Sequence, residues 1–259
     1  MDLQNIHGHK ELAELNGEER VLLCQQIRDF LIENVSQTGG HLASNLGVVE
    51  LTVAIETVYD TARDRLVFDV GHQSYVHKIL TGRQSGFAAL RQFGGMAGFP
   101  KPSESDTDAF TAGHASSSVS IALGMARART VQGGKYNVVA LMGDGAATGG
   151  LAFEGLNDAA VSKEPLIVIL NDNELSIDRN VGGMAKHLSA LRTRDNYLGF
   201  KQQYRHFILR LPGGKTIYRF THNLKERLRR MLLPTTIFDV LLPQVFSGEK
   251  IGSWKKFWK

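Results

Sequence analysis

The sequence predicts an α/β protein in which a parallel β-sheet carries helices on both faces. Two apolar runs, residues 138–142 and 166–170, have the length and composition of buried strands, and a segment of helical character, residues 151–161, lies between them. A strand, a helix and a second strand in this order form a β-α-β unit with parallel strands. A third apolar run, residues 66–70, adds a strand upstream. This alternation predicts a sheet that is covered on both sides.

Three further segments have the pattern of helices. Residues 17–36 place apolar side chains near helical spacing until Gly39 and Gly40 interrupt the pattern, and residues 48–59 resume it. A segment rich in small residues, 119–129, predicts a helix whose alanines and glycine, Gly124, allow close packing on the sheet.

Polar side chains follow the two central strands of this pattern. Asp144 stands between Gly143 and Gly145 directly after the first strand, and Asn173 comes 28 residues after Gly145, just beyond the second strand. Open α/β sheets bind ligands at the carboxyl ends of their strands. A carboxylate and an amide offer the oxygen ligands that suit Mg²⁺, and glycine lets the backbone approach a phosphate closely. The sequence therefore predicts a site for a metal ion and a diphosphate.

Three glycine-histidine pairs fall at predicted strand or helix ends, at His41, His72 and His114. Histidine hydrogen-bonds phosphate and transfers protons near neutral pH, so three such turns in one α/β domain favour a function. A serine cluster, residues 116–118, precedes the small-residue helix. It is compatible either with anion binding by its hydroxyls and amides or with ordinary helix capping.

Composition limits the remaining possibilities. No apolar run has the roughly 20 residues that span a bilayer, so we expect no membrane segment. The single cysteine, Cys24, excludes an internal disulfide and agrees with a cytoplasmic protein; we expect it to be a buried structural thiol. Residues 201–259 hold 13 Lys and Arg against 3 Asp and Glu, but no nucleic-acid motif accompanies this basic tail, and we expect no nucleic-acid partner.

The longest motifs of the chain resemble those of the 1-deoxy-D-xylulose-5-phosphate synthase family. They are residues 38–47 (TGGHLASNLG), 68–75 (FDVGHQSY), 77–83 (HKILTGR), 143–150 (GDGAATGG) and 171–177 (NDNELSI). The resemblance runs from about residue 10 to Phe238 and implies a thiamine diphosphate-binding fold. Transketolases in general fit these motifs less well.

The resemblance assigns roles to particular residues. It implies that Asp144 and the Asn173 side chain bind Mg²⁺ together with the backbone carbonyl of Leu175, a position where the family often has methionine. It implies that His41 lies over the thiazolium ring and the substrate and assists proton transfer. It also implies a set of cofactor contacts, which are His72 (with a catalytic role as well), Gly113, His114, Ala115, Gly145, Ala146 and Asn173.

Members of this family condense pyruvate with glyceraldehyde 3-phosphate and release CO₂, with thiamine diphosphate as electron sink. Their product feeds isoprenoid, thiamine and pyridoxal synthesis. They are dimers whose sites need both large domains, so a homodimer or a partner that carries the other domains is expected.

The resemblance ends near residue 238, and we predict a cofactor domain over residues 1–238 and a divergent basic tail over residues 239–259. The family's pyrimidine-binding domain, its third domain and the glutamate that activates the aminopyrimidine find no match here. This pattern predicts a truncated or frameshifted synthase that is inactive alone. The alternatives are the diphosphate-binding subunit of a split enzyme and a non-catalytic cofactor-binding module.

Overall fold

The computed structural model describes residues 2–171, which all lie in one compact unit. Its helices are α1 (His9–Glu14), α2 (Gly17–Thr38), α3 (Leu42–Leu46), α4 (Val49–Val58), α5 (Tyr75–Leu80), α6 (Ser118–Val131) and α7 (Gly150–Val161). Its strands are β1 (Arg65–Phe68), β2 (Val138–Gly143) and β3 (Ile167–Asn171), and its 3-10 turns are η1 (Leu3–Asn5), η2 (Gln84–Ala89) and η3 (Ala146–Thr148).

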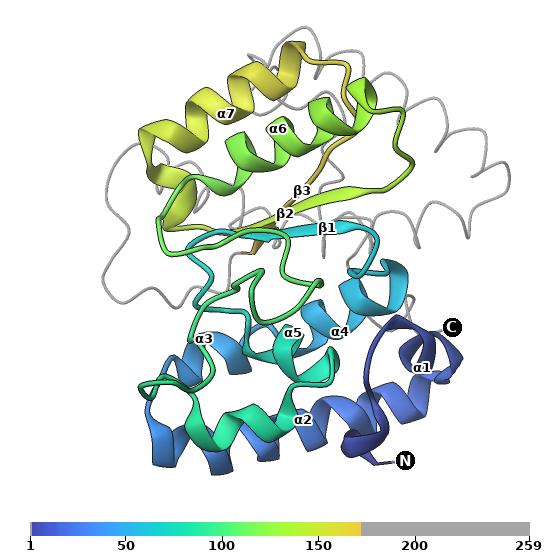
Figure 1. Cartoon of the computed structure of the whole chain (residues 1–259), viewed down its shortest axis with the longest axis vertical. Helices are drawn as coiled ribbons and strands as arrows, with labels where there is room; N and C mark the ends of the chain where they lie inside the picture. Colours follow the sequence, from blue (N-terminus) through green and yellow to red (C-terminus); the bar gives the residue numbers. More distant parts are fainter. Residues whose placement is uncertain (1, 172–259) are drawn as a thin grey trace, which may run out of the picture. The chain divides into compact units, whose positions relative to one another are not determined.

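The three strands form one parallel sheet in the order β1-β2-β3, as the sequence predicts (Figure 1). Arg65 pairs with Val138, and Val139 pairs with Ile167. Successive side chains of a strand point to opposite faces. The expectation of a parallel sheet is therefore confirmed for the described residues.

Helices cover both faces of this sheet. On one face Leu66 and Phe68 of β1 pack against Ile55 of α4. On the other face Val67 packs against alanines of α6, Ala122 among them, and Figure 1 shows α7 on the same side as α6. The predicted covering on both sides is confirmed.

Close packing of the small-residue helix comes from other residues than expected. Ala122 and Ala126 are fully buried against the sheet, as predicted. Gly124 instead is exposed, and a β-carbon added there would meet nothing within 4 Å, so its expected role in packing is wrong. A glycine of α7, Gly155, lets α7 approach α6 closely instead: a β-carbon added at Gly155 would lie 2.7 Å from Oγ of Ser120 in α6.

Helices α1 to α5 share a second core. Leu23, Ile27 and Leu31 of α2 are fully buried and pack in one cluster with Val53 of α4 and Ile79 of α5. Helix α2 begins with a capping box in which the Asn16 side chain accepts from the amide of Glu19 and the Glu19 side chain accepts from the amide of Asn16.

Cys24 lies in this second core. It is 3% exposed, and burial raises the pKa of its thiol to about 12, in agreement with a structural role. Among residues 2–171, each helix is too short or too polar to cross a membrane.

The first strand ends earlier than the apolar pattern indicates. It stops at Phe68, and Val70 adopts a positive φ of 60° followed by Gly71 at 90°. An L side chain rarely adopts this conformation, and glycine does so without steric cost. The turn redirects the chain at Asp69 and sets the place of the histidine that follows.

Candidate active site at the carboxyl ends of the strands

The carboxyl ends of all three strands meet at one edge of the sheet. The Asp69 amide, directly after β1, donates to the carbonyl oxygen of Leu141 in β2 at 2.7 Å. The Asp144 amide, directly after β2, donates to the carbonyl oxygen of Asn171 at the end of β3 at 3.1 Å. Asp144 is 7% exposed. The edge where open α/β sheets bind ligands therefore carries two aspartates and an asparagine.

Asp69 holds the loop that precedes α6. Its Oδ1 accepts from the amide of Ser116 at 2.7 Å, and its Oδ2 accepts from the amide of Ser118 at 3.0 Å. A carboxylate at a helix N-terminus satisfies amides that lack a partner within the helix. The serine cluster therefore presents neither of these amides to an external anion, and it does not cap α6 with its own side chains. Asp69, which directly follows β1, caps α6 instead.

Two more hydrogen bonds join the loops of the candidate site. Oγ of Ser116 donates to the carbonyl oxygen of Ala146 at 2.8 Å, and the amide of Val70 donates to the carbonyl oxygen of His114 at 3.3 Å. The structure thus ties together the loops that carry most of the cofactor contacts expected from the sequence, which are Gly113, His114, Ala115, Gly145 and Ala146.

Open space lies beside two glycines of these loops. A β-carbon added at Gly113 or Gly143 would meet no atom within 4 Å, and Gly113 has a positive φ of 152°. His114 and Ala115 are exposed. Backbone atoms at these positions are accessible to a ligand, which is the property expected of a diphosphate cradle.

His41 and His72 lie face to edge, with ring centroids 5.4 Å apart. His41 precedes α3, and its backbone amide donates to the hydroxyl oxygen of Tyr75 at 3.5 Å. The Phe99 ring lies 6.1 Å from the His41 ring. Nδ1 of both histidines is buried and has no hydrogen-bond partner among the described residues. Buried polar atoms normally have partners, so two such atoms side by side indicate a place for a ligand.

The surroundings keep both histidines in the neutral form. Burial, followed by the positive charge of Arg91, lowers the pKa of His41. Burial and the neighbouring His41 lower the pKa of His72, which Asp69 only partly offsets. Each ring therefore has one donor and one acceptor nitrogen near neutral pH.

Asn45 in α3 connects the two histidine turns. Its Nδ2 donates to the carbonyl oxygens of His41 and His72, at 2.8 Å each, and its Oδ1 accepts from the amide of Tyr75 at 2.9 Å. Both the nitrogen and the oxygen of its side chain thus hold the turns and the start of α5. Asn45 is fully buried.

Only part of the expected metal site lies in the described residues. Asp144 does, whereas Asn173 and Leu175 lie outside them. Within residues 2–171 no group of three or more His, Cys, Asp or Glu side chains could hold a metal ion. Asn171 adds a buried Nδ2 that has no partner within the described part of the chain.

The sequence analysis did not assign roles to Asp69 or Asn45, although the quoted motifs contain both. A local signal existed for Asp69, because a carboxylate directly follows an apolar strand and precedes a glycine turn. Asn45 carried a weaker signal, a polar residue in a short helix beside apolar neighbours. Apart from His41, which is four residues from Asn45, their partners lie 27 to 49 residues away in the chain, and a local pattern does not identify these.

Solved structures of transketolases share this fold. A transketolase from Pichia stipitis aligns with a TM-score of 0.52 over 59% of this chain and 26% of its own, at 22% identity. Transketolase from Leishmania mexicana aligns with a TM-score of 0.50 over 67% of this chain and 28% of its own, at 21% identity. The fold of this chain is therefore the α/β fold of the transketolases, as the sequence predicts.

Sequence comparison specifies the family. The family model for 1-deoxy-D-xylulose-5-phosphate synthase matches residues 3–247. The synthase of Clostridium kluyveri is 49% identical over 238 residues, which cover 92% of this chain and 38% of the relative. That of Clostridium tetani is 50% identical over 230 residues, which cover 88% of this chain and 37% of the relative. The chain belongs to the 1-deoxy-D-xylulose-5-phosphate synthase family, and it spans about 38% of the length of such relatives.

Proposed function

We propose that this chain provides the site for the diphosphate and Mg²⁺ of thiamine diphosphate in a 1-deoxy-D-xylulose-5-phosphate synthase. The reaction would condense pyruvate with glyceraldehyde 3-phosphate and release CO₂. The observation that carries the proposal is the pair of buried, unpartnered Nδ1 atoms of His41 and His72, in turns at the sheet edge that also carries Asp144. Family membership supports the same assignment.

Asp144 would bind Mg²⁺ through its carboxylate, together with the Asn173 side chain and the carbonyl oxygen of Leu175. Oxygen ligands of this kind suit a hard divalent cation. Backbone groups of the tied loops would contact the cofactor, namely those of Gly113, His114, Ala115, Gly145 and Ala146. The open space beside Gly113 and Gly143 supports this assignment, because a β-carbon at either position would occupy that space.

When bound, thiamine diphosphate supplies an electron sink for cleavage of the bond between CO₂ and the rest of pyruvate. His72 would hydrogen-bond the cofactor through its unpartnered Nδ1. His41 would transfer a proton at its Nδ1, and its lowered pKa suits this role because the neutral ring accepts a proton near pH 7. Tyr75 and Phe99 line the same ring and restrict water around it.

We further propose that the chain works as a homodimer, or with a polypeptide that carries the family's other domains, in the cytoplasm. These assignments rest on family membership alone.

Titration calorimetry of the full 259-residue chain with thiamine diphosphate tests the proposal, with and without MgCl₂. We expect binding that depends on Mg²⁺. Asp144→Ala removes a proposed metal ligand and should weaken the Mg²⁺-dependent binding about 10- to 100-fold. Asp158→Ala removes an exposed carboxylate that pairs with Arg127 on the surface and serves as the control.

A folded chain that binds thiamine diphosphate equally well with and without Mg²⁺ would contradict the proposed site. So would an Asp144→Ala variant that binds like Asp158→Ala. A second assay measures deoxyxylulose phosphate formation by the chain alone and with the remaining domains added in trans. Activity only in the second mixture is the expected result, and binding without activity in either mixture would favour a non-catalytic module.

A further inference from the structure

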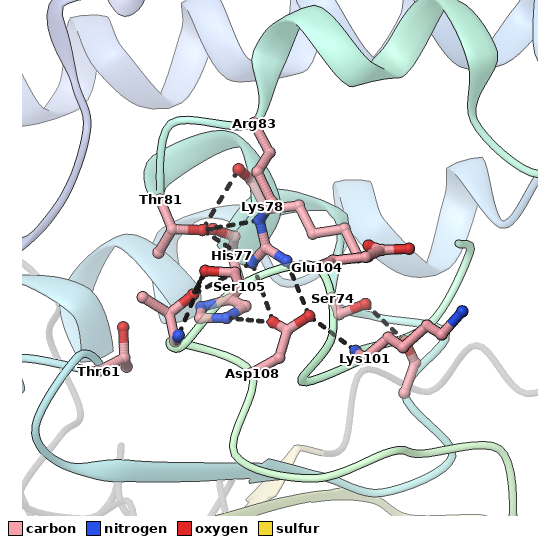
Figure 2. Close-up of polar contacts among 12 residues, drawn as sticks. Thr61, Ser74, His77, Lys78, Thr81, Arg83, Lys101, Glu104, Ser105 and Asp108 are labelled. Atoms are coloured by element: carbon pink, nitrogen blue, oxygen red, sulfur yellow. Dashed lines mark hydrogen bonds and ion pairs between the residues drawn. The ribbon is translucent and has the colours of Figure 1, made fainter. Parts of the chain in front are cut away.

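A buried network of charged side chains lies outside the residues assigned to the site. It joins Glu56 of α4, His77 of α5, Arg83 just after α5 and Asp108 of the long segment before α6. Figure 2 shows His77, Arg83 and Asp108 of this network. Glu56 is 0%, His77 1% and Asp108 3% exposed. Ionisable side chains are almost never this buried unless they are paired. Such a network fixes the elements that it connects.

Asp108 connects three members of this part of the chain, His77, Arg83 and the backbone of Lys101. Its Oδ1 accepts from Nε2 of His77 at 3.1 Å and from Nη2 of Arg83 at 3.0 Å. Its Oδ2 accepts from Nη1 of Arg83 at 2.8 Å and from the amide of Lys101 at 2.7 Å. Four donors on one carboxyl group require the ionised form. Figure 2 shows Asp108 reaching all three of these residues.

The geometry also defines the charge of His77. Its Nδ1 lies 2.5 Å from Oε1 of Glu56, and its Nε2 faces Asp108, so both ring nitrogens face carboxyl oxygens. A neutral ring has only one N–H, and the pair of His77 and Glu56 therefore shares an additional proton. Charge balance agrees, because His77 and Arg83 as cations neutralise the two carboxylates. The pKa of His77 is accordingly raised: burial opposes its charge, but Glu56 and Asp108 outweigh burial.

A second, partly buried ion pair anchors the same segment. Nζ of Lys78, fully buried in α5, donates to Oε2 of Glu104 at 2.6 Å. Oε1 of Glu104 accepts from the amide of Ala97 at 2.7 Å. Asp108 and Glu104 thus each bind one side chain of α5 and one backbone amide of residues 97–101. Residues 97–101 are held against α5 at both ends.

The held residues contact both histidine turns. Phe99 lies against the His41 ring, with centroids 6.1 Å apart. A β-carbon at Gly71, next to His72, would lie 2.7 Å from Cδ of Pro100, so Pro100 packs directly on that turn. The network is therefore connected to the site through two adjacent residues, Phe99 and Pro100.

We propose that Asp108 is a positioning residue of this enzyme, which holds Phe99 and Pro100 against the turns of His41 and His72 through its contacts with His77, Arg83 and Lys101. Among the described residues, Asp108 has hydrogen bonds to the ring of His77 but to neither the His41 nor the His72 ring. Its effect is to keep Phe99 against the half-buried His41 ring and so to favour the neutral form of that ring. The inference rests on the proposed roles of His41 and His72, but its consequence is measurable in the protein without any ligand.

The test is NMR titration of the His41 ring in the ligand-free, full-length chain. Asp108→Asn keeps the shape of the side chain and loses an acceptor for Arg83 or Lys101. We expect the segment to loosen, His41 to become more hydrated and its pKa to rise towards the ordinary value. Phe99→Leu should cause a similar rise, and Asp108→Asn should add little in that background, because both variants act through one contact.

Asp158→Asn is the matched control, because Asp158 also binds an arginine, Arg127, in a two-pronged pair. It should leave the pKa of His41 unchanged. If Asp108→Asn does not fold, Arg83→Lys replaces it. This variant keeps the positive charge but loses the bidentate contact with Asp108, and it should raise the pKa of His41 less than Asp108→Asn would.

An unchanged pKa of His41 in the folded variant of the network would overturn the proposal. Equal rises in the network variant and in Asp158→Asn would also overturn it, since a general loosening would then be the cause. Neither result depends on cofactor binding. Failure of this inference is therefore distinguishable from failure of the proposed function.

Discussion

Nδ2 of Asn45 lies 2.8 Å from the backbone carbonyl oxygen of His72, 27 residues along the chain. The same nitrogen also donates to the carbonyl oxygen of His41, at 2.8 Å. One amide therefore sets the spacing of the two histidine turns. The histidine rings acquire their edge-to-face arrangement through the backbone rather than through a direct hydrogen bond.

Asn45→Ala should destabilise the protein by about 2 to 3 kcal/mol, because the carbonyl oxygen of His72 and the amide of Tyr75 both lose their side-chain partner. Urea unfolding of the full chain measures the loss. Asn34→Ala is the control, since Nδ2 of Asn34 donates only to Phe30 within the same helix, and it should cost less than about 0.5 kcal/mol. Equal losses in both variants would contradict a special role for Asn45.

Asp69→Asn should destabilise the protein by about 1 to 2 kcal/mol, because asparagine has one acceptor oxygen for the two amides that Asp69 binds. The helix that loses its cap is α6, so hydrogen exchange should accelerate at the first turn of α6. Asp60→Asn, at an exposed turn where Oδ1 accepts from Ala62, is the control for loss of a carboxylate. Unchanged exchange at Ser118 would refute the assignment of Asp69 as the cap.

Much of the fold was predictable because the strands are local patterns. The runs at residues 138–142 and 166–170 lie within one residue of β2 and β3. Residues 138–142 are all buried, as their unbroken apolar sequence indicates, whereas the residues of β3 are half-buried or exposed. Helix α2 was predictable for a similar reason: its capping residue, its apolar spacing and the glycine that ends it are all nearby in sequence. These signals do not depend on distant partners.

The candidate site was predictable only where a motif is contiguous. Gly143 to Gly145 follows a strand, and its position at the sheet edge comes directly from that order. The cap of α6 was not predictable, because the local serines are ordinary capping residues and the distant Asp69 replaces them. Asn173 and Leu175 lie outside the described residues, so their part in a metal site stays a prediction.

The sequence contains a signal for the buried charged network of Glu56, His77, Arg83 and Asp108 that the sequence analysis did not use. Glu56 falls on the same helical face as the buried Val49 and Val53 of α4, which are seven and three residues away. A carboxylate at a core position needs a cationic partner. That reasoning predicts a buried partner for Glu56, but only the tertiary structure identifies it as His77.

His77→Gln should change how stability depends on pH. The pKa of His77 is raised in the folded protein above the ordinary 6.5, because Glu56 and Asp108 outweigh the effect of burial. A raised histidine pKa stabilises the fold fully below the unfolded pKa, and the contribution disappears as pH rises through the folded pKa. The stability advantage of the wild type over His77→Gln should therefore fall as pH increases above 6.5.

Urea unfolding of both proteins from about pH 5 to about pH 9 measures this difference. His7→Gln, a substitution of an exposed histidine, gives the effect of the same change outside the network. A difference that stays constant or grows with pH would show that His77 is not held as a cation.

Gly149→Ala should destabilise the protein by about 1 to 3 kcal/mol through a direct clash. Gly149 has a φ of −77°, so alanine meets no backbone strain there, but its β-carbon would lie 2.0 Å from Oγ and 2.7 Å from Cβ of Ser116. Ser116 must then release the carbonyl oxygen of Ala146, which separates two loops of the site. Thermal and urea unfolding measure the cost.

Two further variants separate this clash from the general effect of replacing glycine. Gly124→Ala, where the space is open and the residue lies inside α6, should stabilise the protein by about 0.5 to 1 kcal/mol. In a Ser116→Gly background the clashing atoms are absent, and glycine suits the positive φ of 69° at position 116. Gly149→Ala should therefore cost much less in that background than in the wild type. An equal cost in both backgrounds would mean that contact with Ser116 is not what excludes a side chain at position 149.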